Sequence, residues 1–189
     1  MMKRIFIIDC NPKPKSLGFE LFKSYISGAK QAGHAVKIMR LSEMQFETDY
    51  KDADQPIEQC LVDFQNNITW SEHIMMVYPL WWGFMPAKMK GLIDRTFVSG
   101  FAYEYEGKKA LPKKLLMGRS IDVLVTSDTP NWIFKLIYKA AAFKVMRMQI
   151  FEFVGIKPVK LHMFSPIQSS TEHKRKSWIE KTYRLGSKI

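Results

Sequence analysis

Two tryptophans and a phenylalanine follow the apolar stretch 74–78, in the run Pro79-Leu80-Trp81-Trp82-Gly83-Phe84. Large aromatic side chains at the end of a strand are unfavourable in water unless a flat partner covers them. An isoalloxazine ring is such a partner, because it stacks on aromatic rings and accepts hydrogen bonds from neighbouring backbone amides. Gly83 would allow the backbone to approach the ring closely. The alternative interpretation is that these rings seal the core or a subunit contact.

A second loop, residues 10–17, follows the apolar stretch 4–9 and leads into a helical pattern. The free N–H groups of a helix N-terminus, its dipole and the two lysines of this loop together favour an anion. Ser16 is suited to cap the helix or to donate a hydrogen bond to a phosphate, and a plain capped turn is the alternative. The loop has neither the G-x-G-x-x-G nor the G-x-x-x-x-G-K-[ST] pattern, so a Rossmann dinucleotide site and a P-loop are not indicated.

A third loop, Thr126-Ser127-Asp128-Thr129-Pro130-Asn131-Trp132, carries short polar side chains ahead of a proline that favours a helix start. These groups can offer hydroxyl and backbone donors to the edge of a ring. The same composition is equally typical of an ordinary helix start.

Short apolar stretches alternate with longer stretches of helical period, which predicts an α/β fold with parallel strands joined by crossover helices. Strands are predicted at residues 4–9, 34–41, 74–78, 121–126 and 158–164. Helices are predicted from the first loop to residue 33, at 56–70, at 86–97, at 130–153 and after residue 171, with a hairpin within 99–118. The fold class is therefore a doubly wound five-stranded parallel sheet, and 2-1-3-4-5 is the strand order considered for it. Its ligand site lies beyond the carboxyl ends of the strands, where the three loops form one rim.

The composition narrows the classes of function. The 189 residues, 47% of them hydrophobic, predict a single domain spanning residues 1–189. Two distant cysteines and four scattered histidines predict no metal site, and the absence of an apolar run of membrane length or of a signal peptide predicts a cytoplasmic protein. The net charge of +11 fits a solvated basic face, an anionic lipid surface or a phosphorylated small molecule. No base-reading or stacking motif accompanies the charge, so no nucleic-acid partner is expected.

The run from Pro79 to Phe97, PLWWGFMPAKMKGLIDRTF, resembles the central motif of flavodoxin-like NAD(P)H:quinone oxidoreductases. That motif reads P-L-x-W-x-x-x-P-A-x-L-K-G-[WLF]-[IF]-[DE]-R-[VT]-F. The resemblance continues through the residues 101–103, 128–132 and 153–159, and so covers most of the chain. The stretch 128–132 looks like a bacterial subgroup of NAD(P)H-dependent flavin oxidoreductases.

This resemblance implies a flavin that takes a hydride from NAD(P)H and reduces a quinone or similar acceptor, in a homodimer with the flavin near the interface. FMN is favoured over FAD, because the chain is compact and shows no evident adenosine site. By position, the resemblance places Asn11, Ser16 and Leu17 at the flavin phosphate and ribityl chain. It places Pro79, Leu80, Trp81, Trp82, Gly83 and Phe84 along the isoalloxazine, and Thr126, Ser127 and Asp128 at its other edge.

The sequence also departs from the family pattern. The mammalian quinone reductases have two glycines after strand four and then a Tyr and a His that stabilise the reduced flavin. Here Asp128-Thr129-Pro130 replaces the glycines, and no histidine lies between His73 and His162, so no catalytic residue is assigned. Tyr103, Tyr105 and Trp132 are candidates for the wall of the substrate pocket, with core packing as the alternative.

A second hypothesis is a flavin-binding ancillary subunit of a membrane transport system of the potassium-efflux type. Some relatives of the family have that role, and a basic surface would suit a peripheral membrane partner.

Overall fold

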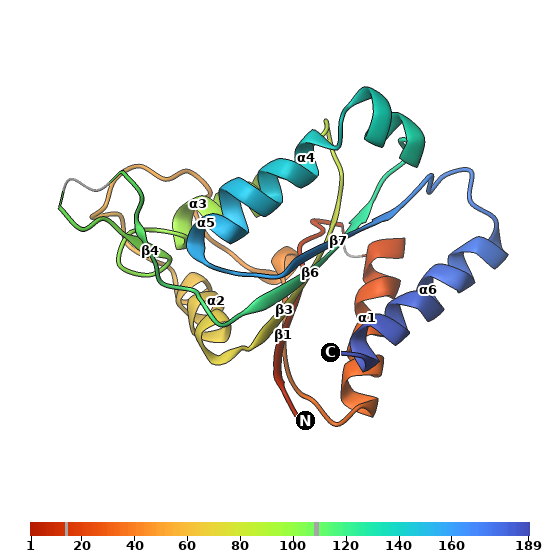
Figure 1. The fold of residues 1–189 in the computed structure, drawn as a ribbon, viewed down its shortest axis with the longest axis horizontal. Helices are drawn as coiled ribbons and strands as arrows, with labels where there is room; N and C mark the ends of the chain where they lie inside the picture. The colour runs from red at the N-terminus through yellow and green to blue at the C-terminus, as the bar shows by residue number, and fades with distance from the viewer. Residues whose placement is uncertain (14, 108–109) are drawn as a thin grey trace.

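In a computed structural model, which describes residues 1–13, 15–107 and 110–189, a five-stranded parallel sheet lies between two layers of helices (Figure 1). The strands of this sheet are β1 (Arg4–Asp9), β2 (Ala35–Arg40), β3 (His73–Pro79), β6 (Ser120–Thr126) and β7 (Val159–Phe164). Their order, β2-β1-β3-β6-β7, confirms the predicted order 2-1-3-4-5. The central strands β1 and β3 are apolar and buried on both faces, as expected for a parallel sheet covered by helices on both sides.

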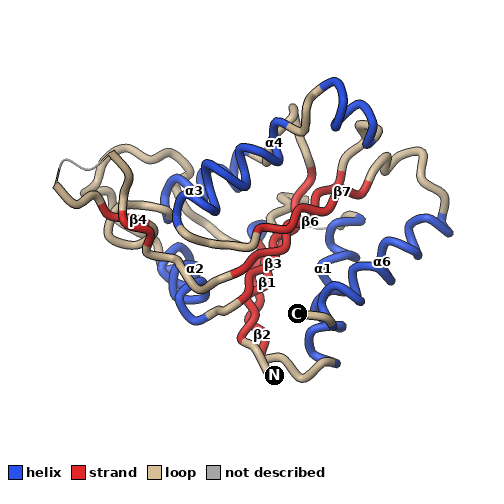
Figure 2. Tube along the Cα trace, viewed as in Figure 1, coloured by secondary structure: helices blue, strands red, loops and turns tan. Residues whose placement is uncertain are grey.

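The helices divide into two layers (Figure 2). Their bounds are α1 (Leu17–Gln31), α2 (Gln59–Trp70), α3 (Ala87–Thr96), α4 (Ala141–Lys144), α5 (Glu152–Val154) and α6 (Glu172–Ser187). Helices α1 and α6 cover one face of the sheet, and the remaining helices cover the other, so each face has its own hydrophobic core. The predicted hairpin is also confirmed, since β4 (Tyr103–Glu104) pairs in antiparallel fashion with β5 (Lys113–Lys114).

The start of α2 differs from the prediction. The sequence predicted that Pro56 opens this helix, but the helix begins at Gln59, with Glu58 as its extended N-cap residue. The buried guanidinium of Arg95 on α3 explains the difference. Its Nη2 donates to the Pro56 carbonyl at 2.7 Å and to the Glu58 carboxylate at 2.9 Å, and both bonds hold this stretch outside the helix.

The predicted continuous helix over residues 130–153 is wrong. The segment contains a wide π turn at Ile133–Ile137, then α4, a second π stretch at Val145–Phe151 and α5. Between the first two, Lys139 and Ala140 have φ angles of 51° and 49°, in the left-handed region that ends a helix. The reversal brings the ring of Phe134 edge-on to Phe143, with centroids 4.8 Å apart. The helix is therefore interrupted at Lys139 and Ala140, and contact between the two aromatic rings holds the segments on either side of the break together.

No helix in the part of the chain that the structure describes is long and apolar enough to cross a membrane. Among the same residues, no group of three or more His, Cys, Asp or Glu side chains could hold a metal ion.

A buried polar chain crosses the face of the sheet covered by α1. The Tyr25 hydroxyl donates to Asp122 Oδ2 at 2.9 Å and lies 2.9 Å from His73 Nε2, while His73 Nδ1 lies 2.7 Å from the Ser120 hydroxyl. These contacts are all satisfied by a neutral His73 whose Nε2–H donates to Tyr25 and whose Nδ1 accepts from Ser120. Burial lowers the pKa of His73 from 6.5 to about 4, although the neighbouring Asp122 carboxylate acts in the opposite direction.

This shift predicts acid sensitivity. Because the unfolded chain protonates His73 near pH 6.5, the unfolded state binds more protons than the folded state between about pH 6.5 and about pH 4. The stabilisation is therefore present above pH 6.5 and is lost as the pH falls. We expect the free energy of unfolding to drop by about 2 kcal/mol between pH 7.5 and pH 5, measured by urea denaturation. A His73→Gln variant should lose that part of the pH dependence, and an equal slope in both proteins would contradict the assignment.

Candidate functional site

The carboxyl ends of β1, β3 and β6 bring the three predicted loops around one cavity of about 170 Å³. The predicted residues that line it are Asn11, Ser16, Leu17, Pro79, Leu80, Trp81, Thr126, Ser127 and Asp128. The register of the sheet explains the convergence. Asp9, at the end of β1, pairs with Val77 on β3, and Pro79 pairs with Thr126 on β6, so the three loops start from one edge.

One end of this cavity is suited to an anion. Ser16 caps α1, because its Oγ accepts the Phe19 N–H at 3.1 Å, and it also accepts a hydrogen bond of 2.7 Å from Asn11 Nδ2. Both bonds use the oxygen as acceptor, so the Ser16 hydroxyl hydrogen can point to a ligand. The N–H groups of Leu17 and Gly18 belong to the first helical turn, where no intrahelical acceptor exists. With the positive end of the helix dipole, these groups can bind a phosphate.

Buried groups below this loop hold its shape. Asp9 is fully buried at the end of β1, and its Oδ1 accepts the Asn11 N–H at 3.1 Å. The Asn11 Oδ1 in turn accepts the Lys13 N–H at 3.0 Å. Burial raises the pKa of Asp9, while the Asn11 N–H and Arg40, whose Nε lies 3.9 Å from Oδ2, oppose that rise. Asp9 therefore holds the start of the loop 10–16 in place.

The second loop makes a tight two-residue turn. The N–H and carbonyl groups of Trp81 and Phe84 exchange two hydrogen bonds of 2.9 Å across Trp82 and Gly83. The φ angles of 49° at Trp82 and 77° at Gly83 are those of a type I′ turn, which favours glycine or asparagine at both positions. A tryptophan in this conformation costs about 1 kcal/mol, and its side chain is fully exposed at 105%. The exposed ring of Trp82 on this strained turn is therefore a candidate for a binding role.

Further contacts join the loops to each other. Lys13 Nζ lies 5.9 Å from the centroid of the Trp81 ring, which links the first loop to the second. The Leu80 N–H donates to the Thr126 carbonyl at 2.8 Å, which links the second loop to the third. The third loop is tied to the chain after β7, because Asp128 Oδ1 accepts the Gln168 N–H at 2.7 Å.

Both the sequence and the fold resemble those of known proteins. The sequence profile of the family described as having a flavodoxin-like fold matches residues 3–184. The chain belongs to this family. A solved structure from Streptococcus mutans, the Smu.1420 protein, is 27% identical, with a TM-score of 0.87 over 98% of this chain and 100% of that one. An NAD(P)H:quinone oxidoreductase from Methanothermobacter marburgensis is 21% identical, with a TM-score of 0.84 over 99% and 96% of the two chains.

Similarity to curated sequences is confined to part of their length. A protein of Haemophilus influenzae, described as an uncharacterized NAD(P)H oxidoreductase, is 30% identical over 108 residues, which are 57% of this chain and 52% of that protein. The chain spans about half the length of the curated relatives that it matches. The family predicted from the Pro79–Phe97 motif is thus confirmed.

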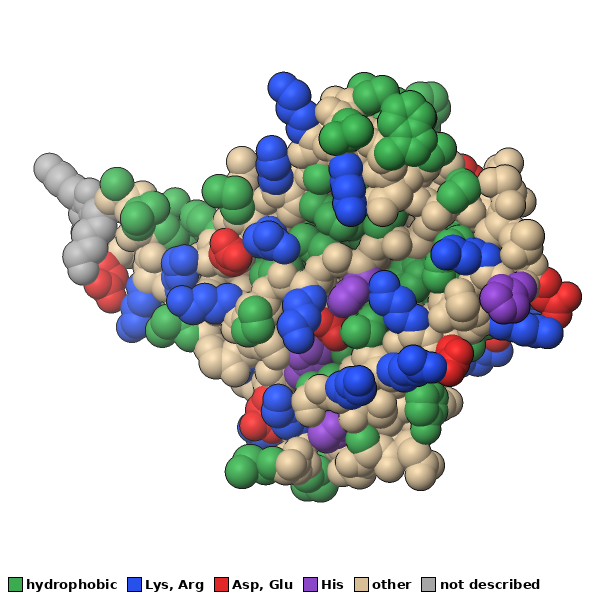
Figure 3. Space-filling model, turned by 45° about the vertical axis from the view of Figure 1, so that its right-hand side comes forward, with side chains coloured by type: hydrophobic (Ala, Val, Ile, Leu, Met, Phe, Trp, Pro, Cys, Tyr) green, Lys and Arg blue, Asp and Glu red, His purple; other side chains and the backbone are tan. Residues whose placement is uncertain are grey.

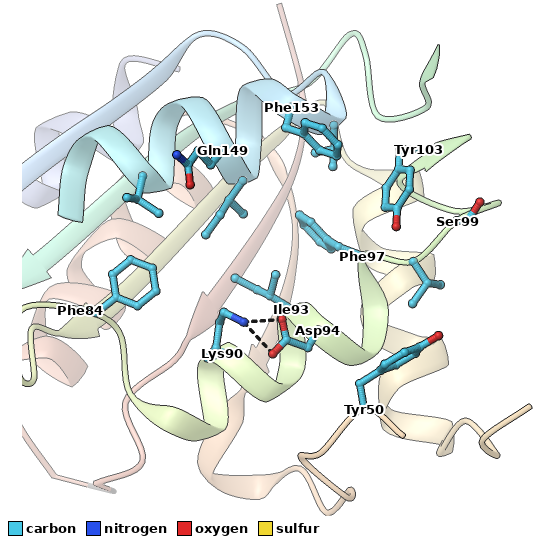
Figure 4. A pocket seen from close by; sticks show the side chains of 14 residues that line it. Tyr50, Phe84, Lys90, Ile93, Asp94, Phe97, Ser99, Tyr103, Gln149 and Phe153 are labelled. Carbon is cyan, nitrogen blue, oxygen red and sulfur yellow. Dashed lines mark hydrogen bonds and ion pairs between the residues drawn. The ribbon is translucent and has the colours of Figure 1, made fainter. Parts of the chain in front are cut away.

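The remaining predicted residues of this flavodoxin-like protein lie outside the first cavity. Trp82 and Gly83 line a second cavity of about 550 Å³. Leu80 lines both this cavity and the first one. Phe84 and Tyr103 line a third cavity of about 760 Å³, which lies between α3 and the stretch Val145–Val154. Figure 4 shows the rings of Phe84, Phe97, Tyr103 and Phe153 around it, with the Lys90–Asp94 ion pair of 2.6 Å at its edge.

Two of the predicted substrate-pocket residues line none of these three cavities. Tyr105 is 54% exposed and places its ring edge-on to Tyr103, with centroids 5.7 Å apart. Trp132 is 60% exposed at the start of the first π turn. Both remain predictions as substrate contacts.

Sequence reasoning missed several lining residues. Ile167, which follows β7, lines the first cavity, and its N–H donates to the Ser127 carbonyl at 3.1 Å. The rule that ligands bind beyond the carboxyl ends of parallel strands could have identified Ile167, because the carboxyl end of β7 lies at the same edge of the sheet as those of β1, β3 and β6. Phe134 and Tyr138 line the second cavity, and the predicted continuous helix concealed them.

Proposed function

We propose that the protein is a flavin-dependent NAD(P)H oxidoreductase that passes two electrons from NAD(P)H through bound FMN to a quinone-like acceptor. One observation carries the proposal: three loops converge on a cavity lined by Ser16 and the first turn of α1, which offer hydrogen-bond donors for a phosphate, and by the aromatic ring of Trp81. The name of the Methanothermobacter marburgensis protein, an NAD(P)H:quinone oxidoreductase, supports the same reaction, and that of the Haemophilus influenzae protein, an NAD(P)H oxidoreductase, supports the use of NAD(P)H.

The residues present fit a flavin mononucleotide. Ser16 and the N–H groups of Leu17 and Gly18 would hold its phosphate, and the strained, exposed Trp82 would lie against its ring. The third loop would offer Ser127 and backbone groups to the ring edge. When bound, the flavin supplies the hydride acceptor and donor, so the protein needs to provide orientation, electrostatics and exclusion of water. Accordingly, no residue of this chain is proposed as an acid or a base.

FMN is proposed rather than FAD, because Ser16 and the first turn of α1 offer donors for one phosphate group at this cavity. A homodimer with the flavin near the subunit interface is part of the same proposal, and light scattering on the purified protein tests it.

Analysis of the purified protein tests the proposed function. We expect flavin absorbance that follows the protein, release of FMN on denaturation as identified by mass, and NAD(P)H oxidation that depends on an added quinone. Protein that stays colourless and binds no flavin on titration would refute the proposal. Protein that binds FMN tightly but shows no turnover with NADH or NADPH would leave a flavin-binding protein without the proposed reaction.

A further inference from the structure

The charges of the chain are divided between the two faces of the sheet. Residues 156–189, which include β7 and α6, contain eight lysines or arginines and two glutamates, a net charge of +6. Residues 41–63, which end within α2, contain seven carboxylates and one lysine, a net charge of −6. Since α6 and α2 cover opposite faces of the sheet (Figure 1), the molecule has a basic side and an acidic side.

The cations of residues 156–189 are not neutralised by acids around them. Both glutamates already pair within α6, Glu172 with Lys176 at 2.7 Å and Glu180 with Arg184. Within the described part of the chain, no carboxylate pairs with the six others, all of them exposed: Lys157, Lys160, Lys174, Arg175, Lys181 and Lys188. We call these six side chains the basic face. Like charges that are held together in spite of their repulsion suit a negatively charged partner.

Packing holds two of these cations at the surface. Lys174 Nζ lies 5.9 Å from the centroid of the Trp178 ring, and Lys181 Nζ lies 5.6 Å from that of Phe164. Both rings are buried, so the two lysine stems cover the core while their ammonium groups stay in solvent. With a spacing of seven residues, Lys174, Lys181 and Lys188 lie on one side of α6. Figure 3, in which the α6 side comes forward, shows Lys and Arg side chains spread over it.

The basic face is long and has no cavity. α6 has 16 residues and is therefore about 24 Å long. It lies along α1, where the Ser24 hydroxyl donates to the Ile179 carbonyl at 2.7 Å. None of the three cavities described above is lined by a residue of α6. Cations spread over such a length match an extended anionic surface better than a single phosphate group.

We propose that the basic face docks this protein on an anionic lipid bilayer. Each lysine or arginine near such a surface strengthens binding about fivefold. The acidic side, on the other face of the sheet, is repelled by the same lipids, so the two sides together set one orientation. Only one large apolar side chain of α6 is exposed, Tyr183 at 37%, so the contact depends on charge rather than on insertion into the bilayer.

A nucleic acid is a poorer partner for the same cations. Groove recognition needs a helix that can enter the groove, and stacking on bases needs exposed rings. α6 is packed along α1, and Trp178 is only 8% exposed beneath Lys174. A second copy of the chain could bring its segment 41–63 against the basic face. That contact joins two different surfaces, however, and leads to an open filament unless it closes into a ring.

Vesicle flotation of the purified protein tests this proposal without NAD(P)H or an acceptor, so the result is independent of the proposed function. We expect the protein to float with vesicles of phosphatidylcholine mixed with phosphatidylglycerol, and not with vesicles of phosphatidylcholine alone. Binding should fall at least about tenfold as sodium chloride rises from about 0.05 M to about 0.5 M, because salt screens a contact that depends on charge.

Two triple variants separate the basic face from the net charge. The first replaces three of the six cations: Lys174→Gln, Lys181→Gln and Lys188→Gln. It should bind the anionic vesicles at least about thirtyfold more weakly. The matched control removes the same charge from exposed positions on β2, the segment 41–63 and the hairpin: Lys37→Gln, Lys51→Gln and Lys113→Gln. It should lose less than about threefold, and circular dichroism should show both variants folded.

Four results would overturn the proposal. The first is binding to the mixed vesicles that is no stronger than binding to phosphatidylcholine alone. The second is an equal loss in the two triple variants, because net charge would then be responsible. The third is duplex DNA of mixed sequence that binds more tightly than the vesicles at the same salt concentration. The fourth is an oligomer that light scattering shows to dissociate in the first triple variant, because the basic face would then be a subunit contact.

Discussion

Replacing Ser16 by aspartate should weaken FMN binding by at least about a hundredfold and leave the fold intact. Aspartate caps a helix as well as serine does, so it can still accept the Phe19 N–H. Its carboxylate would, however, lie where the phosphate of FMN is proposed to bind. Two negative groups about 4 Å apart repel by several kcal/mol in a partly buried site. The variant also lacks the hydroxyl hydrogen that Ser16 can donate. Fluorescence titration with FMN measures the affinity.

Two controls separate repulsion of the phosphate from damage to the site. Riboflavin has the same ring and no phosphate, so its affinity should change by less than about threefold in the Ser16→Asp variant. Thr171 caps α6 in the same way, by accepting the Lys174 N–H, and it lies at the start of a helix outside the cavity. Thr171→Asp should therefore leave FMN binding unchanged. Equal losses for FMN and riboflavin would show that Ser16→Asp distorts the loop, and an unchanged FMN affinity would place the phosphate elsewhere.

Replacing Gly28 by alanine should lower the free energy of unfolding by at least about 3 kcal/mol. A Cβ atom at this position on α1 would lie 2.1 Å from the Tyr183 carbonyl oxygen and 3.1 Å from the Ser187 nitrogen, both in the backbone of α6. The contact from the other helix is similarly close, because a Cβ atom at Gly186 on α6 would lie 2.3 Å from the backbone carbonyl oxygen of Tyr25 on α1. Backbone atoms cannot rotate away, so the two helices would have to separate and open the core beneath them.

Gly18 provides the matched control on the same helix. Its added Cβ would meet its nearest neighbour, the Ser16 Oγ, at 3.5 Å, which is an ordinary contact. Gly18→Ala should therefore change the free energy of unfolding by less than about 1 kcal/mol, since it also gains helix propensity. Urea unfolding of both variants measures the difference. Similar stabilities for Gly28→Ala and Gly18→Ala would show that α1 and α6 are not in backbone contact.

The sequence predicted the strands and the helix caps, which depend on residues that lie close together along the chain. Apolar runs predicted the buried strands β1, β3 and β6, and alternation predicted the edge strand β2; all five strands of the sheet were predicted to within two residues. Ser16 and Thr171 marked two helix starts, since a capping hydroxyl bonds a backbone N–H three residues away. The expected order of the strands predicted that the three loops lie next to one another, because they follow neighbouring parallel strands.

The sequence by itself thus determined the sheet, its order and the edge at which the three loops meet. Only the tertiary structure decided how the aromatic residues divide among three cavities, that Ile167 joins the first cavity, and that Pro56 is held outside α2 by Arg95. It also decided that the chain reverses at Lys139 and Ala140, where no glycine or proline marks a break. The physical reason is the range of the interactions. Strands and caps follow from hydrophobic period and nearby hydrogen bonds, whereas these features come from packing between segments that are distant in the chain.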